Sequence, residues 1–154
     1  MGLELIVLVG LQGAGKSTFY RTTLAATHAL VSKDLMGRRA RDKQGRQVRE
    51  IAGHLAAGRS VVVDNTNVTV ADRAALLVVG RAHSARVACY LFEPDLLGSR
   101  ERNRLRLGRA RVPDDVLEMT LRRFEPPHPG EGFDALFLVR LDARGGFVVL
   151  LPGP

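Results

Sequence analysis

The sequence predicts an α/β fold in which a parallel five-stranded sheet is covered by helices on both faces and ends in a β-hairpin. Short apolar runs alternate with longer helical patterns along the chain. Most of these runs are continuously apolar, as is typical of strands buried on both faces. No linker-like or low-complexity stretch interrupts them, so we expect one domain over residues 1–154.

The first elements follow from local residue preferences. Residues 5–9 are a β-rich apolar run that Gly10 stops, which predicts a buried strand. A helix is expected over about residues 16–27, and a second short strand over residues 29–31. The chain therefore opens as one strand–helix–strand unit of a parallel sheet.

The middle of the chain repeats this unit. A helix is predicted over about residues 46–57, where Gly58 closes it. Three consecutive valines at 61–63 then form a third strand that ends on Asp64. Strand and acid are thus adjacent at one end of the predicted sheet.

The next helix has a clear start signal. Thr69 is expected to cap a helix over residues 70–82, with Asp72 favourably placed in its first turn. A fourth strand over 87–92 and a helix over about 94–107 follow.

The last elements complete the fold. A helix over about 113–124 begins on a proline and is stopped by the proline pair 126–127. Strands over 136–141 and 147–151 are separated by the glycine pair 145–146, which predicts a terminal hairpin.

Composition indicates a cytoplasmic protein that is not inserted in a membrane. Cys89 is the single cysteine, which excludes an intramolecular disulfide and suits a reducing compartment. No apolar run approaches the roughly 18 residues of a membrane span, and the first residues carry no basic leader. The net charge is +7, and only Lys16, Lys33 and Lys43 of the 23 basic residues are lysine. The basic residues are therefore mostly arginine. Both an arginine-lined surface that binds phosphates and a GC-rich genome explain this preference for arginine over lysine.

The strongest local signal is a match to the phosphate-loop pattern G-x-x-x-x-G-K-[ST]. It lies between a predicted strand and a predicted helix, the context that the motif requires. Glycine amides and the helix N-terminus cradle phosphates, Lys16 reaches the β- and γ-phosphates, and Ser17 is the expected Mg²⁺ ligand. We therefore predict ATP and Mg²⁺ as cofactors, with the nucleotide bound by Gly10, Leu11, Gln12, Gly13, Ala14, Gly15, Lys16, Ser17 and Thr18.

Two carboxylates follow predicted strands at the edge where ligands bind in parallel sheets. Asp34 is placed to accept the proton of an attacking hydroxyl, or alternatively to cap a helix. Asp64 ends a strand as a Walker B acid does and would hold Mg²⁺ beside Ser17. Asn65 and Asn67 follow at once, where turn formation is the alternative to substrate contact.

Several blocks together resemble the kinase domain of polynucleotide 5′-kinases, nearest to the kinase half of the animal polynucleotide kinase 3′-phosphatases and more distantly the phage enzymes. The blocks are residues 10–19, V-S-K-D at 31–34, V-V-V-D-N-T-N at 61–67, R-N-R-L-R at 102–106, and F-E-P-P with E-G-F between 124 and 133. The resemblance covers residues 3–141.

This resemblance implies ATP-dependent phosphorylation of a 5′-hydroxyl on DNA or RNA. It places Asp34 at the position of the general base and Arg106 at that of a lid arginine that contacts the transferring phosphate. Arg102 matches an arginine that the phage enzymes have one helical turn before the lid arginine. The chain departs from the phage pattern at Gly37, where the phage enzymes have an arginine that contacts substrate phosphate. No phosphatase half is present, since the D-x-D-x-T motif is absent.

A lid is predicted over about residues 98–112. Six arginines fall within twelve residues there, at positions 100, 102, 104, 106, 109 and 111. Their mutual repulsion favours a polyanionic ligand, and a solvated helix face is the alternative. As contacts for the acceptor strand we predict Arg38, Asn65, Asn67 and Arg73, which follow the motifs at the edge of the cleft.

The sequence therefore predicts a polynucleotide 5′-hydroxyl kinase whose partner is a nucleic-acid end. A kinase of a small hydroxylated metabolite or nucleoside is the alternative on the same site. A non-catalytic nucleotide-binding switch is a third interpretation, although it would not need the base that Asp34 provides.

Overall fold

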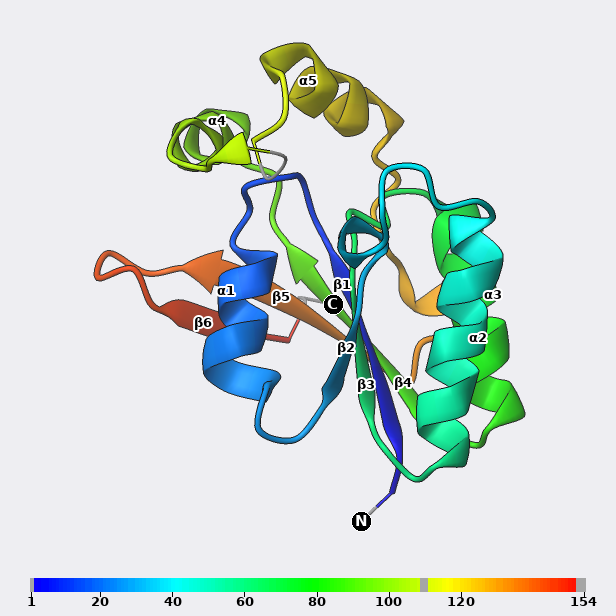
Figure 1. Cartoon of the computed structure of the whole chain (residues 1–154). Coiled ribbons are helices and arrows are strands. Elements are labelled where there is room, and N and C mark those ends of the chain that lie inside the picture. Colours follow the sequence, from blue (N-terminus) through cyan, green and yellow to red (C-terminus); the bar gives the residue numbers. More distant parts are fainter. Residues whose placement is uncertain (1, 109–110, 152–154) are drawn as a thin grey trace.

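A six-stranded sheet forms the centre of the protein in the computed structural model, which describes residues 2–108 and 111–151 (Figure 1). The strands are β1 (Glu4–Val9), β2 (Ala29–Val31), β3 (Val61–Asp64), β4 (Arg86–Phe92), β5 (Ala135–Leu141) and β6 (Phe147–Leu150). Their order across the sheet is β2-β3-β1-β4-β5-β6. The pairs among β1 to β5 are parallel, and β6 runs antiparallel to β5. The predicted α/β fold with a C-terminal hairpin is thus confirmed.

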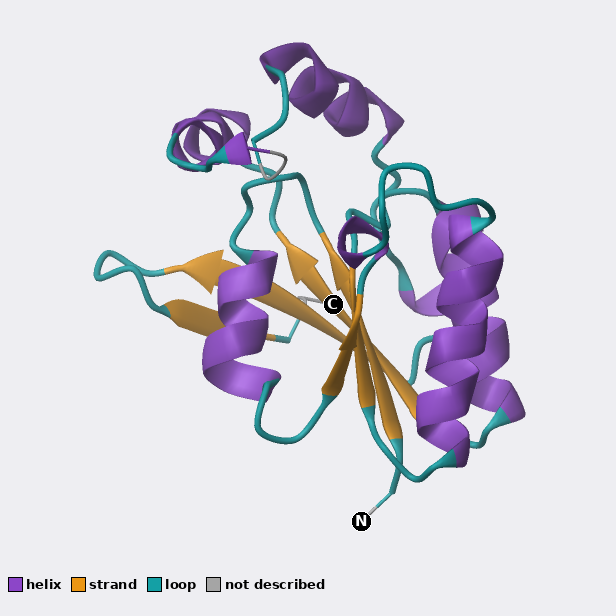
Figure 2. Ribbon diagram, in the orientation of Figure 1, coloured by secondary structure: helices purple, strands orange, loops and turns teal. Residues whose placement is uncertain are grey.

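Helices cover the two faces unequally, as Figure 2 shows. The α-helices are α1 (Lys16–Phe19), α2 (Lys43–Ala56), α3 (Val70–Ala82), α4 (Leu96–Arg104) and α5 (Asp114–Arg123). One face carries α1, the other carries α2 and α3, and α4 and α5 lie beyond the carboxyl ends of β1 and β4 (Figure 1). In the described part of the chain, no helix is long and apolar enough to cross a membrane.

The apolar run of β1 is continuous because both of its faces are buried. Leu5 and Val7 belong to the core cluster beneath α2 and α3, whereas Ile6 and Leu8 belong to the cluster around Phe19 of α1. Successive side chains of a strand point to opposite faces, so a central strand with two covered faces needs apolar residues at every position.

The register of the strands brings the predicted site residues to one edge. Leu8 of β1 lies opposite Asp64 of β3, and Val31 of β2 lies opposite Val63. Because these strands are parallel, the segments that follow them all leave from the same edge of the sheet. The glycine-rich loop and both predicted carboxylates therefore lie close together.

The predicted helix over residues 16–27 is helical as far as Leu24, but it changes type after Phe19 and residues 25–27 form a turn. The α-helix ends at Phe19, and Tyr20–Leu24 forms a π-helical turn that the bond from Ala25 N to the Tyr20 carbonyl (2.8 Å) closes. The hydroxyl of Thr22 donates to the carbonyl of Thr18 (2.9 Å). Such back-bonding competes with the regular helical pattern and accounts for the widened turn.

The start of α3 agrees with the sequence prediction. The Thr69 hydroxyl accepts from the backbone N–H of Asp72 (3.1 Å), and the Asp72 carboxylate accepts from the backbone N–H of Thr69 (3.4 Å). This reciprocal capping box fixes where the loop after β3 ends.

Gly80 allows α3 to pack closely on the sheet. A Cβ at this position would lie 2.6 Å from a methyl carbon of Val87 and 3.0 Å from one of Leu5. We expect Gly80→Ala to lower the free energy of unfolding by about 1–3 kcal/mol through overpacking, although alanine is the better helix former. The measurement is chemical denaturation.

Gly53 in α2 is the matched control, since a Cβ there meets nothing within 4 Å. Gly53→Ala should raise the free energy of unfolding by up to about 1 kcal/mol. Equal effects of the two substitutions would contradict the close approach of α3 to the sheet.

Candidate functional site

The loop between β1 and α1 forms a concave turn of backbone amides. Gly13 and Gly15 have positive φ angles of 77° and 99°, and Gly15 is the N-cap of α1. A Cβ at Gly13 would lie 2.6 Å from the carbonyl of Ser99 in α4, so this position requires glycine. The loop and the start of α1 therefore form the phosphate cradle that the motif predicts.

Lys16 lies folded back across this loop. Its ammonium donates to the carbonyls of Gly10 and Leu11, both at 2.8 Å, and the residue is only 8% exposed. The pKa of Lys16 is lowered to about 8, mainly by burial and in smaller part by nearby Arg106, while Asp64 and Asp34 act in the opposite direction. A phosphate at the cradle would replace the two carbonyls as the partner of this ammonium.

Ser17 and Asp64 meet at the floor of the site. The Ser17 hydroxyl donates to the Asp64 carboxylate at 2.6 Å, and Asp64 is buried at the end of β3. A hydroxyl and a carboxylate oxygen fit Mg²⁺, which is usually held by one or two protein oxygens together with substrate phosphates. Within residues 2–108 and 111–151, no group of three or more His, Cys, Asp or Glu side chains is placed to hold a metal.

Asp34 faces the cleft instead of capping a helix. The cap of the short 3₁₀ turn Lys33–Leu35 is Ser32, whose hydroxyl accepts from the backbone N–H of Asp34 (3.2 Å). The Asp34 side chain is exposed and lines the cleft opposite the phosphate loop. The alternative of an Asp34 N-cap is therefore wrong, because the neighbouring serine has that role.

The loop after β3 connects the two sides of the site. The side-chain oxygen of Asn65 accepts from the backbone N–H of Lys33 (2.9 Å), beside Asp34. The carbonyl of Thr66 accepts from the backbone N–H of Gly10 (3.0 Å), the first residue of the phosphate loop. One short loop thus holds both the acceptor-side turn and the phosphate loop.

Two adjoining cavities form the cleft, one of about 540 Å³ over the phosphate loop and one of about 570 Å³ over the turn that carries Asp34. Residues that line both lie at their junction: Gln12, Ser17, Arg21, Asp34, Asp64, Asn65, Thr66 and Arg106. The first cavity also contains Gly13, Gly15, Lys16 and Thr18, and the second contains Tyr20, Ser32, Lys33 and Asp72. The arrangement offers room for a nucleotide on one side and an acceptor on the other, with Asp34 between them.

The predicted lid contributes two arginines to the cleft. Arg102 lines the first cavity, and its Nε donates to the carbonyl of Gly13. Arg106 lines both cavities and is near enough to affect the pKa of Lys16. Both are therefore placed to face a bound nucleotide.

The other described arginines of the lid, Arg100, Arg104 and Arg111, do not line the cleft. Arg100 pairs with Glu118 of α5, and Arg104 pairs with Glu101 at 3.4 Å. Arg111 is exposed, and Arg109 lies outside the described residues. The solvated-face interpretation thus suits part of the lid, and the ligand interpretation suits Arg102 and Arg106.

The prediction that Arg73 contacts the acceptor is wrong. Its side chain is fully buried and pairs with Glu131 at 2.8 Å, so it cannot touch an acceptor in the cleft. Arg38 is exposed but lines neither of the two cavities. Asn67 lines the second cavity, yet it is buried and its amide donates to the carbonyl of Leu8 (2.9 Å).

Within the phosphate loop, three predicted ligands present no side chain to the cleft. Leu11 and Ala14 are buried core residues, and the N–H of Gly10 is already bound to Thr66. Sequence reasoning missed Arg21, an exposed residue at the junction of the two cavities. Its position four residues after Ser17, on the same side of a predicted helix, is the signal that would have found it.

Comparison with known proteins identifies the family and the fold. The sequence model of the AAA domain family matches residues 5–127. Kti12 from Chaetomium thermophilum in complex with ADP-AlF3 superposes with a TM-score of 0.70 at 20% identity, covering 92% of each chain.

Two kinases have the same fold. A fungal RNA kinase gives a TM-score of 0.66 at 17% identity, covering 93% of this chain and 77% of that one. A gluconokinase from Sinorhizobium meliloti 1021 gives 0.63 at 19% identity, covering 88% and 81%. The fold is thus that of a P-loop kinase-like domain, whose neighbours include proteins with different acceptors.

The lowered pKa of Lys16 leads to a pH prediction. Because the ammonium loses its proton as the pH rises through about 8, affinity for a fluorescent ATP analogue should fall above that pH. Below it the ammonium is charged and affinity should level off, since phosphate favours the protonated form. The measurement is a set of binding titrations at pH values on both sides of this pKa.

Lys16→Arg is the control, because a guanidinium stays protonated throughout this range. Its affinity, whatever its absolute value, should lose the decline above pH 8. The same decline in both proteins would assign the titration to another group.

Proposed function

The chain belongs to the AAA domain family, and we propose that it transfers the γ-phosphate of ATP to the 5′-hydroxyl at the end of a DNA or RNA strand. The observation that carries this proposal is the position of Asp34 at the junction of the two cavities, opposite the phosphate loop. A general base is needed where the acceptor hydroxyl meets the γ-phosphate. A module that only binds nucleotides has no need of a carboxylate there.

The chain's own groups account for each part of the transfer. The loop amides and Lys16 bind the β- and γ-phosphates, and Asp34 accepts the proton of the acceptor hydroxyl as its oxygen attacks the γ-phosphorus. The bond from that phosphorus to the bridging oxygen breaks, and ADP leaves. Arg106 faces the charge that develops on the equatorial oxygens. Mg²⁺, held by Ser17 and Asp64, would supply further charge neutralisation at the phosphates.

A basic loop supports a polymeric acceptor. Directly after the turn that carries Asp34, the chain has Arg38, Arg39 and Arg41, all of them exposed. Phosphates that follow the terminal nucleotide of a strand would lie against such a surface, because guanidinium groups pair well with phosphate oxygens. The net charge of +7 also favours binding of a polyanionic strand.

A small hydroxylated acceptor is the second candidate, and the lining of the second cavity favours it. Tyr20, Ser32, Asp34 and Asp72 offer hydroxyl and carboxylate groups that suit a sugar-like molecule. Arg38 lies outside this cavity and Arg73 is buried away from it. The likeness to a gluconokinase is consistent with such an acceptor, as the likeness to an RNA kinase is with a strand end.

Asp34→Asn tests the proposed base. Turnover of phosphate transfer to a 5′-hydroxyl oligonucleotide should fall by roughly 10²–10⁴, while the affinity for ATP stays within about twofold. Asparagine has nearly the same shape but cannot accept the proton.

Asp42→Asn is the matched control. This carboxylate is exposed, lies eight residues further on beside the same basic loop, and caps α2, a role that asparagine also serves. Its turnover should stay near that of the wild type. Equal turnover of the two variants would remove Asp34 from the mechanism.

A further inference from the structure

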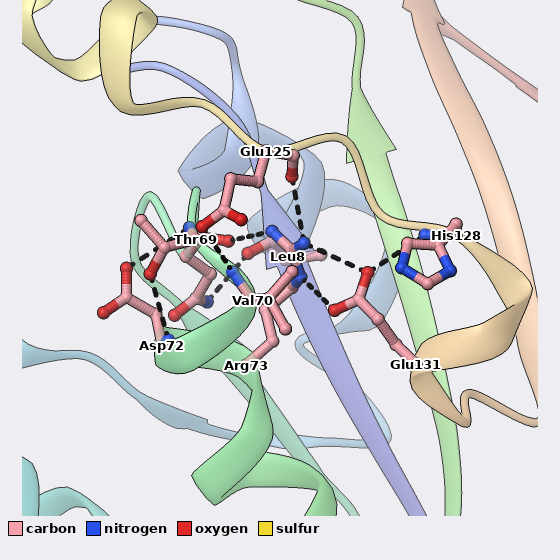
Figure 3. A network of polar contacts seen from close by, with 9 residues as sticks. Leu8, Thr69, Val70, Asp72, Arg73, Glu125, His128 and Glu131 are labelled. Atoms are coloured by element: carbon pink, nitrogen blue, oxygen red, sulfur yellow. Dashed lines mark hydrogen bonds and ion pairs between the residues drawn. The ribbon is translucent and has the colours of Figure 1, made fainter.

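The segment after α5 is joined to the first turn of α3, directly after the loop that follows β3, by a buried ion pair (Figure 3). Arg73 is 0% exposed and the Glu131 side chain 2%. The guanidinium donates from Nε to one carboxylate oxygen at 2.8 Å and from Nη2 to the other at 3.0 Å. The F-E-P-P and E-G-F strings, to which the proposed reaction gives no role, lie on this segment.

Arg73 uses all three of its guanidinium nitrogens. Nη1 donates to the carbonyl of Asn67 at 2.9 Å, and Nη2 also donates to the carbonyl of Glu125 at 2.9 Å. Glu131 accepts in addition from the backbone N–H of His128 at 3.0 Å. The pair therefore fixes two carbonyls and one amide of two separate segments.

The same two segments touch at a second point. The backbone N–H of Glu125 donates to the carbonyl of Val68 (2.7 Å), and the Glu125 carboxylate accepts from the backbone N–H of Val70 (3.2 Å). The end of the loop after β3 is thus held between Arg73 and Glu125, as Figure 3 shows.

The other end of this loop reaches the reaction centre. Its members hold Gly10 through the carbonyl of Thr66 and the Lys33 amide through the side chain of Asn65. We infer that Arg73 and Glu131 are positioning residues, which fix the loop after β3 and through it the phosphate loop and the turn that carries Asp34. The catalytic meaning of this inference rests on the proposed phosphate transfer, whereas its structural content does not.

Stability alone is a weak explanation for this pair. Two charges lose their hydration when buried, and well-packed apolar residues in their place are often neutral or stabilising. An apolar pair, however, has no donors for the carbonyls of Asn67 and Glu125. What the guanidinium adds is a fixed geometry between segments 58 residues apart in sequence.

The test uses the double variant Arg73→Met with Glu131→Leu, which keeps the core apolar and removes the donors. Residue-level amide hydrogen exchange is measured by NMR. We expect the amides of Gly10 and Lys33 to exchange at least about tenfold faster than in the wild type. The amides of Val7 and Val62, in the centre of the sheet, report global stability, and the acceleration at Gly10 and Lys33 should exceed any change at these two amides.

A purely local structural role makes a different prediction. Only the amides inside the network, those of Val70, Glu125 and His128, would then exchange faster. Unchanged protection at Gly10 and Lys33 would overturn the inference. Glu131→Gln is the second variant if the double variant does not fold, and its expected exchange pattern is the same.

Arg81→Gln is the matched control. Arg81 lies on the same helix, is exposed, and donates to the carbonyl of Gly132, next to Glu131, without contacting the loop after β3. Gly10 and Lys33 should keep their protection in this variant.

Turnover per folded molecule is the second readout, and it should fall about tenfold in the double variant. The KM for ATP should rise as well, because the phosphate loop is one of the two elements that the pair fixes. If no acceptor is phosphorylated even by the wild type, the proposed function fails, while the exchange data still decide the inference.

Discussion

The site depends on one constraint: the last residue of β3 and the five-residue loop that follows it, residues 65–69, must hold three groups that come from different parts of the chain. Asp64 contributes the carboxylate beside Ser17, Asn65 holds the turn of Asp34, and Thr66 holds the first residue of the phosphate loop. Parallel register brings the strand ends together, but these bonds set their spacing. Phosphate transfer needs reacting groups placed to within a fraction of an ångström. The rigidity of this loop therefore determines how fast a reaction in the cleft can proceed.

The arginine surplus divides into groups with different physical roles. Several arginines are compensated by carboxylates, and the ion pairs include Arg46, Arg73, Arg86, Arg100, Arg104 and Arg140. Those that line the cleft are Arg21, Arg102 and Arg106. Composition alone therefore overstates the phosphate-binding surface. The cationic groups that remain at the cleft and on the loop after Asp34 are the ones that bear on the choice of acceptor.

Local patterns predicted most of the fold, because they depend on neighbouring residues. The apolar run of β1, the glycines of the phosphate loop and the capping box of Thr69 and Asp72 each act within a few positions. Arg73 was misjudged for the opposite reason, since its partner Glu131 is 58 residues away and no local signal distinguishes a buried arginine from a cleft arginine. The π-helical turn after α1 likewise depends on where the hydroxyl of Thr22 bonds.

The central claim is that the acceptor in this cleft is a strand with a 5′-hydroxyl end. The most direct measurement offers γ-labelled ATP together with a 5′-hydroxyl oligonucleotide, its free 5′-terminal nucleoside and a panel of small hydroxylated metabolites, at several salt concentrations. The account predicts label on the oligonucleotide 5′ end, with acceptor affinity that falls with salt at a slope of about −1.5 to −3 for two to four phosphate contacts. Label on a small metabolite instead, or equal affinity for oligonucleotide and nucleoside with no salt dependence, would contradict it.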